Sequence, residues 1–405
     1  MLKASALLYS IVFSIVILII TLFIVSSLYY TQISSIKLGR IERVNDNMES
    51  AIAVLLNTDN NSATIDLFKD GKDLAYVNAY KWGMYDIKTV ICTVGKDTLQ
   101  KSFIFGYEPN KDYALSINST DRVLNIAGRT LIKGNAYIPN GTFKRAYIEG
   151  CGSLSNPIEG FIKSSPYSSG VDMGKLKQEL SAFLGTVNPT LGEIQEIASP
   201  VSFSGIPNVV FSEGQINIGS EKIKGHYIIK SARKISVSKA ALLEDIILIA
   251  PEIELEDGFK GALQCYASNK ILVGKHSNLN YPSALCLLPS SANDSVGIII
   301  LGEDSKMAGT IVAFTGTDKN RQSLVTIDKG CKLYGQVFSE GYTQLQCKVI
   351  GNIQTGSFYL KTASSIYDNT LLDAEINIAQ IDSSYLSYFS SSNKQGRKKI
   401  VKWLY

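Results

Sequence analysis

Histidine is nearly absent from this chain of 405 residues, in which only His226 and His276 occur. Neither has a cysteine or an aspartate at the spacing of a metal site or a catalytic triad, and two histidines exclude a three-histidine metal centre. The sequence also lacks a phosphate-binding glycine loop, a nucleophile elbow and an EF-hand calcium loop. With no catalytic constellation in view, we expect a protein that is not an enzyme and that holds no cofactor or metal.

A strong excess of either charge is missing as well. Lys+Arg 40 and Asp+Glu 36 leave a formal net charge of +4, which is close to neutral for this length. This balance gives no general nucleic-acid footprint, so we expect no nucleic-acid partner. Six cysteines are too few for a disulfide scaffold. Apolar residues make up 45% of the chain, which allows a sizeable core and excludes a disordered protein.

Charged residues are entirely absent from residues 4–36. The most apolar part begins at Leu7 and ends at Leu28, and about 20 apolar residues are enough for a helix to cross a bilayer core. A cleaved signal peptide is the alternative, but the run is long for one and no small-x-small site closes it cleanly. We therefore predict a single membrane-spanning helix from Leu7 to Leu28 that contacts lipid.

The orientation of this span is predicted from its flanks and from the rest of the chain. Lys37, Arg40 and Arg43 follow the span and by themselves favour a cytoplasmic C-terminal side. Acidic residues follow immediately, however, and long domains translocate largely regardless of flanking charge. Since the body of the chain has the pattern of a cell-surface structure, we predict an N-terminus inside and a C-terminal domain outside the cytoplasm.

The first 55 residues resemble the N-terminal module of minor pilins and pseudopilins. The helical pattern continues past the span to about residue 57, with apolar residues three to five apart. The segment Asn47-Met48-Glu49-Ser50-Ala51 is similar to an element near the end of the pilin helix, and Lys3-Ala4-Ser5-Ala6-Leu7-Leu8 resembles the start of that module. Tyr9 stands where most pilins carry a glutamate, and only Ala4 could replace the glycine before the processing point. The resemblance implies assembly with other pilin-like subunits, or with itself, through the helix.

The body of the chain reads as mostly β. Period-two alternation broken by glycines between residues 58 and 120 predicts a small antiparallel β subdomain. From residue 121 to 388, short apolar strands recur. Ile235, Ile253 and Ile271 begin similar segments 18 residues apart, and Cys331-Lys-Leu-Tyr-Gly335 repeats as Cys347-Lys-Val-Ile-Gly351 after 16. A further repeat places a glycine between apolar residues, at Gly134, Gly225, Gly309, Gly335 and Gly351.

A period of 16 to 18 residues suits one coil of a parallel β-helix, a solenoid in which each coil pairs with the coils above and below. This pattern resembles that of the polymer-forming bactofilins. The alternative is a β-sandwich, which would show longer alternating strands joined by hairpins. We favour the β-helix for residues 121–388, with an insertion at 150–206 that contains a short helix at residues 172–184. Residues 1–57 form the membrane and stalk helix, and residues 389–405 form a basic C-terminal tail.

Cys331 and Cys347 occupy equivalent positions on the two matching segments. One interpretation is a ladder of stacked small apolar side chains. The other is a disulfide in an exported protein. We favour the ladder because neighbours in register rarely have disulfide geometry.

Two functions stay open at this stage. The first is a membrane-anchored, non-enzymatic structural protein of the cell surface, similar to part of a pilus or secretion apparatus. The second is a carbohydrate-active or glycan-binding surface protein on the same β scaffold. A groove with at least two converging carboxylates would favour the second.

Overall fold

The computed structural model describes residues 2–58, 62–67, 69, 71, 73–119, 122–165, 171–187, 190–191, 200–289, 296–316, 321–388 and 397–404. The chain divides into two compact units. The first comprises residues 1–78 and 89–101, and the second comprises residues 79–88 and 102–405. The strands β2 (Leu74–Trp82), β3 (Tyr85–Val94) and β4 (Asp97–Tyr107) contribute to both units.

The first unit is built on the helix α1 (Leu2–Asn57), which ends at the residue that the sequence predicts. Its last third is amphipathic, and Val44, Met48, Ala51, Ile52 and Leu55 are buried. Arg40 pairs with Asp97 at 3.0 Å, and Arg43 pairs with the nearly buried Asp73. The strand β1 (Ser62–Asp66) lies antiparallel to β2, in agreement with the predicted antiparallel sheet.

Within the second unit, the described C-terminal residues form a strand. The strand β29 (Lys398–Leu404) pairs antiparallel with β4, and the rings of Phe103 and Trp403 lie 5.4 Å apart. The sequence predicts only a basic tail over residues 389–405, of which residues 389–396 and 405 lie outside the described part. The strand was missed because its apolar residues alternate imperfectly among lysines, so that the basic charge dominates the pattern.

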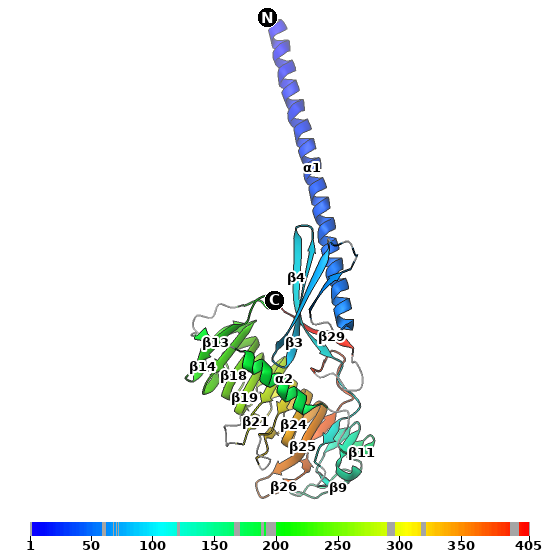
Figure 1. Cartoon of the computed structure of the whole chain (residues 1–405), viewed down its shortest axis with the longest axis vertical. Coiled ribbons are helices and arrows are strands. Elements are labelled where there is room, and N and C mark those ends of the chain that lie inside the picture. The colour runs from blue at the N-terminus through cyan, green and yellow to red at the C-terminus, as the bar shows by residue number, and fades with distance from the viewer. Residues whose placement is uncertain are drawn as a thin grey trace. The chain divides into compact units, whose positions relative to one another are not determined.

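Most of the second unit consists of strands stacked in parallel ladders (Figure 1). The predicted 18-residue spacing is confirmed, because Ile235 pairs with Ile253 and Ile253 with Ile271 in parallel register. This first ladder contains β14 (Ile216–Ile218), β17 (Lys234–Val237), β18 (Leu242–Leu255), β19 (Lys260–Val273), β21 (Ile298–Leu301), β23 (Leu324–Ile327) and β24 (Lys332–Leu345).

Two further ladders use other segments of the same strands. The second adds β15 (Lys222–Lys224), β20 (Asn278–Leu287), β22 (Lys306–Ala313), β25 (Lys348–Lys361), β28 (Glu375–Asn377), β7 (Leu131–Lys133) and β10 (Ile158–Glu159). The third adds β12 (Thr190–Leu191), β13 (Asn208–Ser212), β16 (Tyr227–Ser231), β5 (Leu115–Ile117), β8 (Ala136–Ile138) and β11 (Ile162–Ser164).

Shorter pieces complete the unit. Strand β6 (Leu124–Ala127) lies parallel between β27 (Thr370–Leu372) and β9 (Phe143–Arg145), and β26 (Ile366–Asp368) is antiparallel to β25. A 3-10 turn η1 spans Pro139–Gly141.

The order of strands along the ladders differs from their order along the chain. The early strands β5 and β7 stack on the late strands β25 and β28. β10 and β11 fall inside the predicted insertion at residues 150–206 but belong to the ladders themselves, so the insertion is shorter than predicted. β13, which follows it, lies toward the opposite end of the ladders. This insertion carries the helix α2 (Met173–Thr186), which the sequence predicts and which Asp172 caps by accepting a hydrogen bond from the Lys175 amide.

Apolar clusters hold the described part of the second unit together, and two of them are extensive. The inner faces of the ladders bury Val237, Leu255 and Val273 among many aliphatic side chains. The outer face of the third ladder is also apolar, and it packs under α2 and the turn between β2 and β3 through Trp82, Phe183 and Tyr266. One ladder is thus buried on both faces, whereas the others expose an outer face to solvent.

Candidate functional site: an apolar helix and the charged turns

The N-terminal part of α1 is the first candidate site. Leu7 and Leu28, which bound the predicted span, are 68% and 65% exposed. An 18-residue window of this helix has a mean hydropathy of 3.0 with no buried share, so α1 is long and apolar enough to cross a membrane. An exposed apolar surface of this length is unfavourable in water, and lipid or other apolar helices are the environments that would cover it.

Some hydroxyl groups of α1 donate hydrogen bonds to carbonyl groups of the helix itself. Ser14 donates to the carbonyl of Ser10 at 2.8 Å, and Thr31 donates to the carbonyl of Ser27 at 2.8 Å. An internal acceptor removes most of the cost of placing a hydroxyl in hydrocarbon. These hydroxyl groups are therefore compatible with a membrane-spanning helix.

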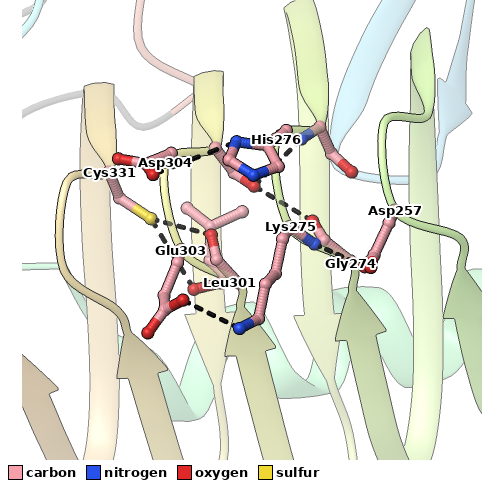
Figure 2. Close-up of polar contacts among 11 residues, drawn as sticks. Asp257, Gly274, Lys275, His276, Leu301, Glu303, Asp304 and Cys331 are labelled. Atoms are coloured by element: carbon pink, nitrogen blue, oxygen red, sulfur yellow. Dashed lines mark hydrogen bonds and ion pairs between the residues drawn. The ribbon is translucent and has the colours of Figure 1, made fainter.

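The turns that enter the second ladder form the second candidate site (Figure 2). They repeat one conformation, in which the same position has a positive φ in successive turns: Gly258 (81°), His276 (56°), Asp304 (56°) and Gly330 (75°). Backbone hydrogen bonds stack these turns, since the amide of His276 donates to the carbonyl of Glu303 at 2.9 Å and that of Asp304 to Lys329 at 3.1 Å. This repeat could not be recognised in the sequence, because segments of different length separate the turns and the spacing between them is therefore irregular.

Side chains of opposite charge alternate along these stacked turns. Asp257 accepts a hydrogen bond from the Lys275 amide at 2.7 Å, and the Lys275 ammonium contacts Glu303 at 2.8 Å. The Glu303 carboxylate raises the pKa of Lys275, and Lys275 in turn lowers the pKa of Glu303. Both groups are exposed, so this arrangement is a solvated ion-pair ladder that stabilises stacking and shows no group prepared for proton transfer.

Cys331 lies at the same corner (Figure 2). The thiol of Cys331 contacts the carbonyl oxygen of Gly302 at 3.0 Å, and burial raises its pKa to about 11. The next residues, Lys332 and Lys348, pair in parallel register, and the Lys348 amide donates to the carbonyl of Cys331 at 3.3 Å. Cys331 and Cys347 are both buried free thiols, and burial also raises the pKa of Cys347. Stacking of the two sulfurs and their redox state in solution stay predictions.

The two histidines lie apart from each other and have different environments. His226 is buried against Trp82 and Phe203, with ring centroids 4.5 and 4.6 Å away, and burial lowers its pKa to about 4. His276 is exposed, with Nδ1 3.9 Å from a carboxylate oxygen of Asp304. Across the described ranges, no group of three or more histidine, cysteine and acidic side chains is placed to hold a metal ion.

A cluster around Lys81 was not visible in the sequence, because its members lie up to 307 residues apart. The Lys81 ammonium contacts Asp86 at 2.9 Å, Glu179 at 3.3 Å and the Tyr388 hydroxyl at 2.5 Å. Burial works to lower the pKa of Lys81, but Tyr388 and Asp86 outweigh it and raise the pKa above its usual range. Lys81 therefore stays protonated and ties α2 to the β2–β3 turn and the C-terminal segment instead of acting as a base.

Comparison with known proteins adds little to this picture. No protein-family model matches the chain, and no curated protein matches it. Among solved structures, the chain is similar to the competence-associated pilin ComZ from Thermus thermophilus, at 9% sequence identity, with 85% of this chain and 88% of that chain covered and a TM-score of 0.27. A TM-score this low establishes neither a shared fold nor a shared function.

Proposed function

We propose that this chain is a membrane-anchored structural protein of pilin-like design, held in the bilayer by α1 and carrying a parallel β-helix as its ectodomain. The observation that carries the proposal is the division of α1 into two parts. Its first part is apolar and exposed, and its last part buries Val44, Met48 and Leu55 within the first unit. This division supports a helix whose last part belongs to a folded domain and whose first part lies in an apolar environment.

The parallel β-helix is supported by the three ladders. Strands β18, β19 and β24 each take part in more than one ladder, so one continuous strand bends from one ladder into the next. Each coil then contributes one segment to each ladder, and its inward side chains stack on those of the next coil. A scaffold of this kind presents rows of outward side chains and needs no catalytic centre.

The pilin-like resemblance of the N-terminal residues adds a proposed mode of assembly. In an assembly of such subunits, the apolar helices would pack against one another. The exposed first part of α1 has an apolar surface suited to this packing. We propose that the partners are other pilin-like subunits or further copies of this chain, with the C-terminal units outside the cytoplasm.

Fractionation of membranes tests the anchor. The full chain is expected in the membrane pellet after a high-salt wash, and deletion of residues 1–36 is expected to release a folded, soluble protein. Deletion of residues 398–404, which leaves α1 intact, is the control and keeps the chain in the pellet. A full-length chain that is washed off by salt contradicts the anchor.

Photo-crosslinking tests the assembly separately. A photoreactive amino acid in place of Ile19 is expected to capture a second apolar helix in cells that express the full chain, whereas the same group at the exposed Lys239 is not. Capture of lipid alone at residue 19 supports the anchor and contradicts the assembly.

A further inference from the structure

One outward column of the second ladder is occupied by lysine in five of seven consecutive layers. Lys222 pairs with Leu242, and Leu243 pairs with Gly261, which places Lys260 in the following layer. From Lys260 the register continues through Asn278 to three further lysines. We call these five residues the lysine row: Lys222, Lys260, Lys306, Lys332 and Lys348.

Stacking like charges in this way opposes folding. Lys306, Lys332 and Lys348 are direct register neighbours on strands ~4.8 Å apart, and like charges directly opposite each other are destabilising. One uncharged residue separates Lys222 from Lys260, and another separates Lys260 from Lys306. Lys348 is relieved by Glu375 at 2.8 Å. The other four lysines of the row are exposed, and none of them forms an ion pair with any residue that the structure describes. The row is therefore an uncompensated strip of positive charge.

Other columns of the same scaffold avoid this cost. In the first ladder, Lys234 pairs with Glu252, and Glu252 with Lys270, so the sign alternates. The stacked turns alternate in the same way, with Lys275 between Asp257 and Glu303. Alternating charge is the favourable arrangement, and both the first ladder and the stacked turns have it. The lysine row carries positive charge only, which points to a negatively charged ligand that balances it.

Acidic groups close to the row are engaged elsewhere. Glu244 is held by Lys224 at 3.0 Å and by Lys402 at 2.7 Å, and Lys402 also contacts the buried Asp245 at 2.8 Å. Lys224, Glu244 and Lys402 line an open groove of about 600 Å³, which Lys222 and Lys260 also line. The charges of Lys222 and Lys260 are therefore not neutralised within the groove. A ligand can reach this end of the lysine row through the groove.

We propose that the lysine row and this groove bind an acidic polysaccharide, whose uronate or sulfate groups recur along an extended chain. The ladder places ammonium groups at multiples of ~4.8 Å along a straight line, which is close to the length of one sugar residue in an extended polysaccharide. Tyr334, two residues after Lys332, is 48% exposed and presents a ring on which a sugar can stack. The occupant is thus a single linear polyanion lying across the coils.

A nucleic acid fits this surface less well. On each strand of a duplex the phosphates recur every ~3.4 Å of helix axis and wind around that axis, so they do not follow a straight row at the strand spacing. Proteins that bind single strands stack successive bases on a series of aromatic rings. The register neighbours of Tyr334 are Ala308 and Ile350, which offer no such series.

The test measures binding of sodium polygalacturonate, a linear polyuronate, to the full chain in detergent micelles at low and high salt. Neutral dextran and duplex DNA are the comparison ligands. The row variant is Lys260→Gln, Lys306→Gln and Lys332→Gln together. The matched control removes three exposed lysines from the alternating columns, Lys239→Gln, Lys270→Gln and Lys329→Gln, so that both variants lose the same net charge.

We expect salt-sensitive binding of the polyuronate, weakened about tenfold in the row variant and nearly unchanged in the control. Thermal unfolding provides a readout without ligand, in which the row variant melts higher than the native chain at low salt and the control does not. Equal loss in both variants, tighter binding of duplex DNA than of the polyuronate, or no polyuronate binding at low salt overturns the proposal.

Discussion

Gly351 lies directly beside Gly335 in neighbouring parallel strands, and both have backbone conformations that favour glycine, with φ of 151° and 141°. A Cβ atom at Gly351 would overlap the carbonyl oxygen of Gly335, and one at Gly335 would overlap the carbonyl oxygen of Gly309. The repeated glycine that the sequence shows at Gly309, Gly335 and Gly351 is thus required where stacked backbones approach most closely.

Replacement of this glycine is expected to be costly. Gly351→Ala should lower the free energy of unfolding by more than about 3 kcal/mol, because it combines a strained φ with a backbone clash. Gly219→Ala is the control, since its Cβ would meet only the Glu221 side chain at 3.6 Å. Denaturant unfolding of the two variants measures the difference, and equal stabilities would contradict the close approach.

Inward and outward positions of one strand should respond differently to substitution. Leu255 is 1% exposed within the core, so Leu255→Asp should cost more than about 4 kcal/mol through loss of packing and burial of an unpaired charge. Glu254, the preceding residue, points outward and pairs with Lys234 at 2.5 Å. Glu254→Gln should change stability by less than about 1 kcal/mol. Similar losses in both variants would show that the inward and outward assignments are wrong.

Acid should weaken the packing around His226. Burial lowers the pKa of His226 to about 4 from its usual 6.5, so between these values the unfolded chain binds more protons than the folded chain. Stability from this residue is complete above about pH 6.5 and is lost as pH falls toward 4, by about 3 kcal/mol in all. His226→Phe lacks this loss, and the difference between the two pH profiles of unfolding measures it. Parallel profiles would place the histidine in water.

Cysteine labelling tests the ladder interpretation of Cys331 and Cys347. Both are buried, and burial raises the pKa of each thiol, so alkylation in the native protein should be slow and should become complete on unfolding. Cys151 is exposed and serves as the internal control that reacts in the native state. Mass spectrometry without reductant counts the labelled sites. If Cys331 and Cys347 stay unlabelled after unfolding until reductant is added, they form a disulfide.

The sequence was informative wherever neighbouring residues determine the structure. The end of α1 at Asn57 followed from a polar run, and the register of Ile235, Ile253 and Ile271 followed from their even spacing. In both cases a periodic apolar pattern has one low-energy solution. The alternation of inward Leu255 with outward Glu254 was readable for the same reason, because one face of that strand meets water.

Contacts between segments that are far apart in the sequence could not be predicted. Tyr266 faces outward yet is fully buried, because α2 covers it. No residue near Tyr266 in the sequence indicates that a helix from another segment packs there. The stacking of β5 on β25 joins Leu115 to Ile353, and any open strand edge of suitable length would satisfy the same backbone groups. The lysine row was equally hidden, since its members meet only after the register is known.

The parallel register also allows the second unit to change in length without a change in how its layers pack. Residues 332–347 form one complete repeat, because the next residue, Lys348, is the register partner of Lys332. Lys306 already pairs with Lys332, so a chain without this repeat could join Cys331 to Lys348 and keep the same neighbours in register. Duplication of the repeat would instead lengthen the protein by one layer. Descendants of such a gene can therefore differ in reach, and in the number of charges they display, while every remaining layer keeps its packing.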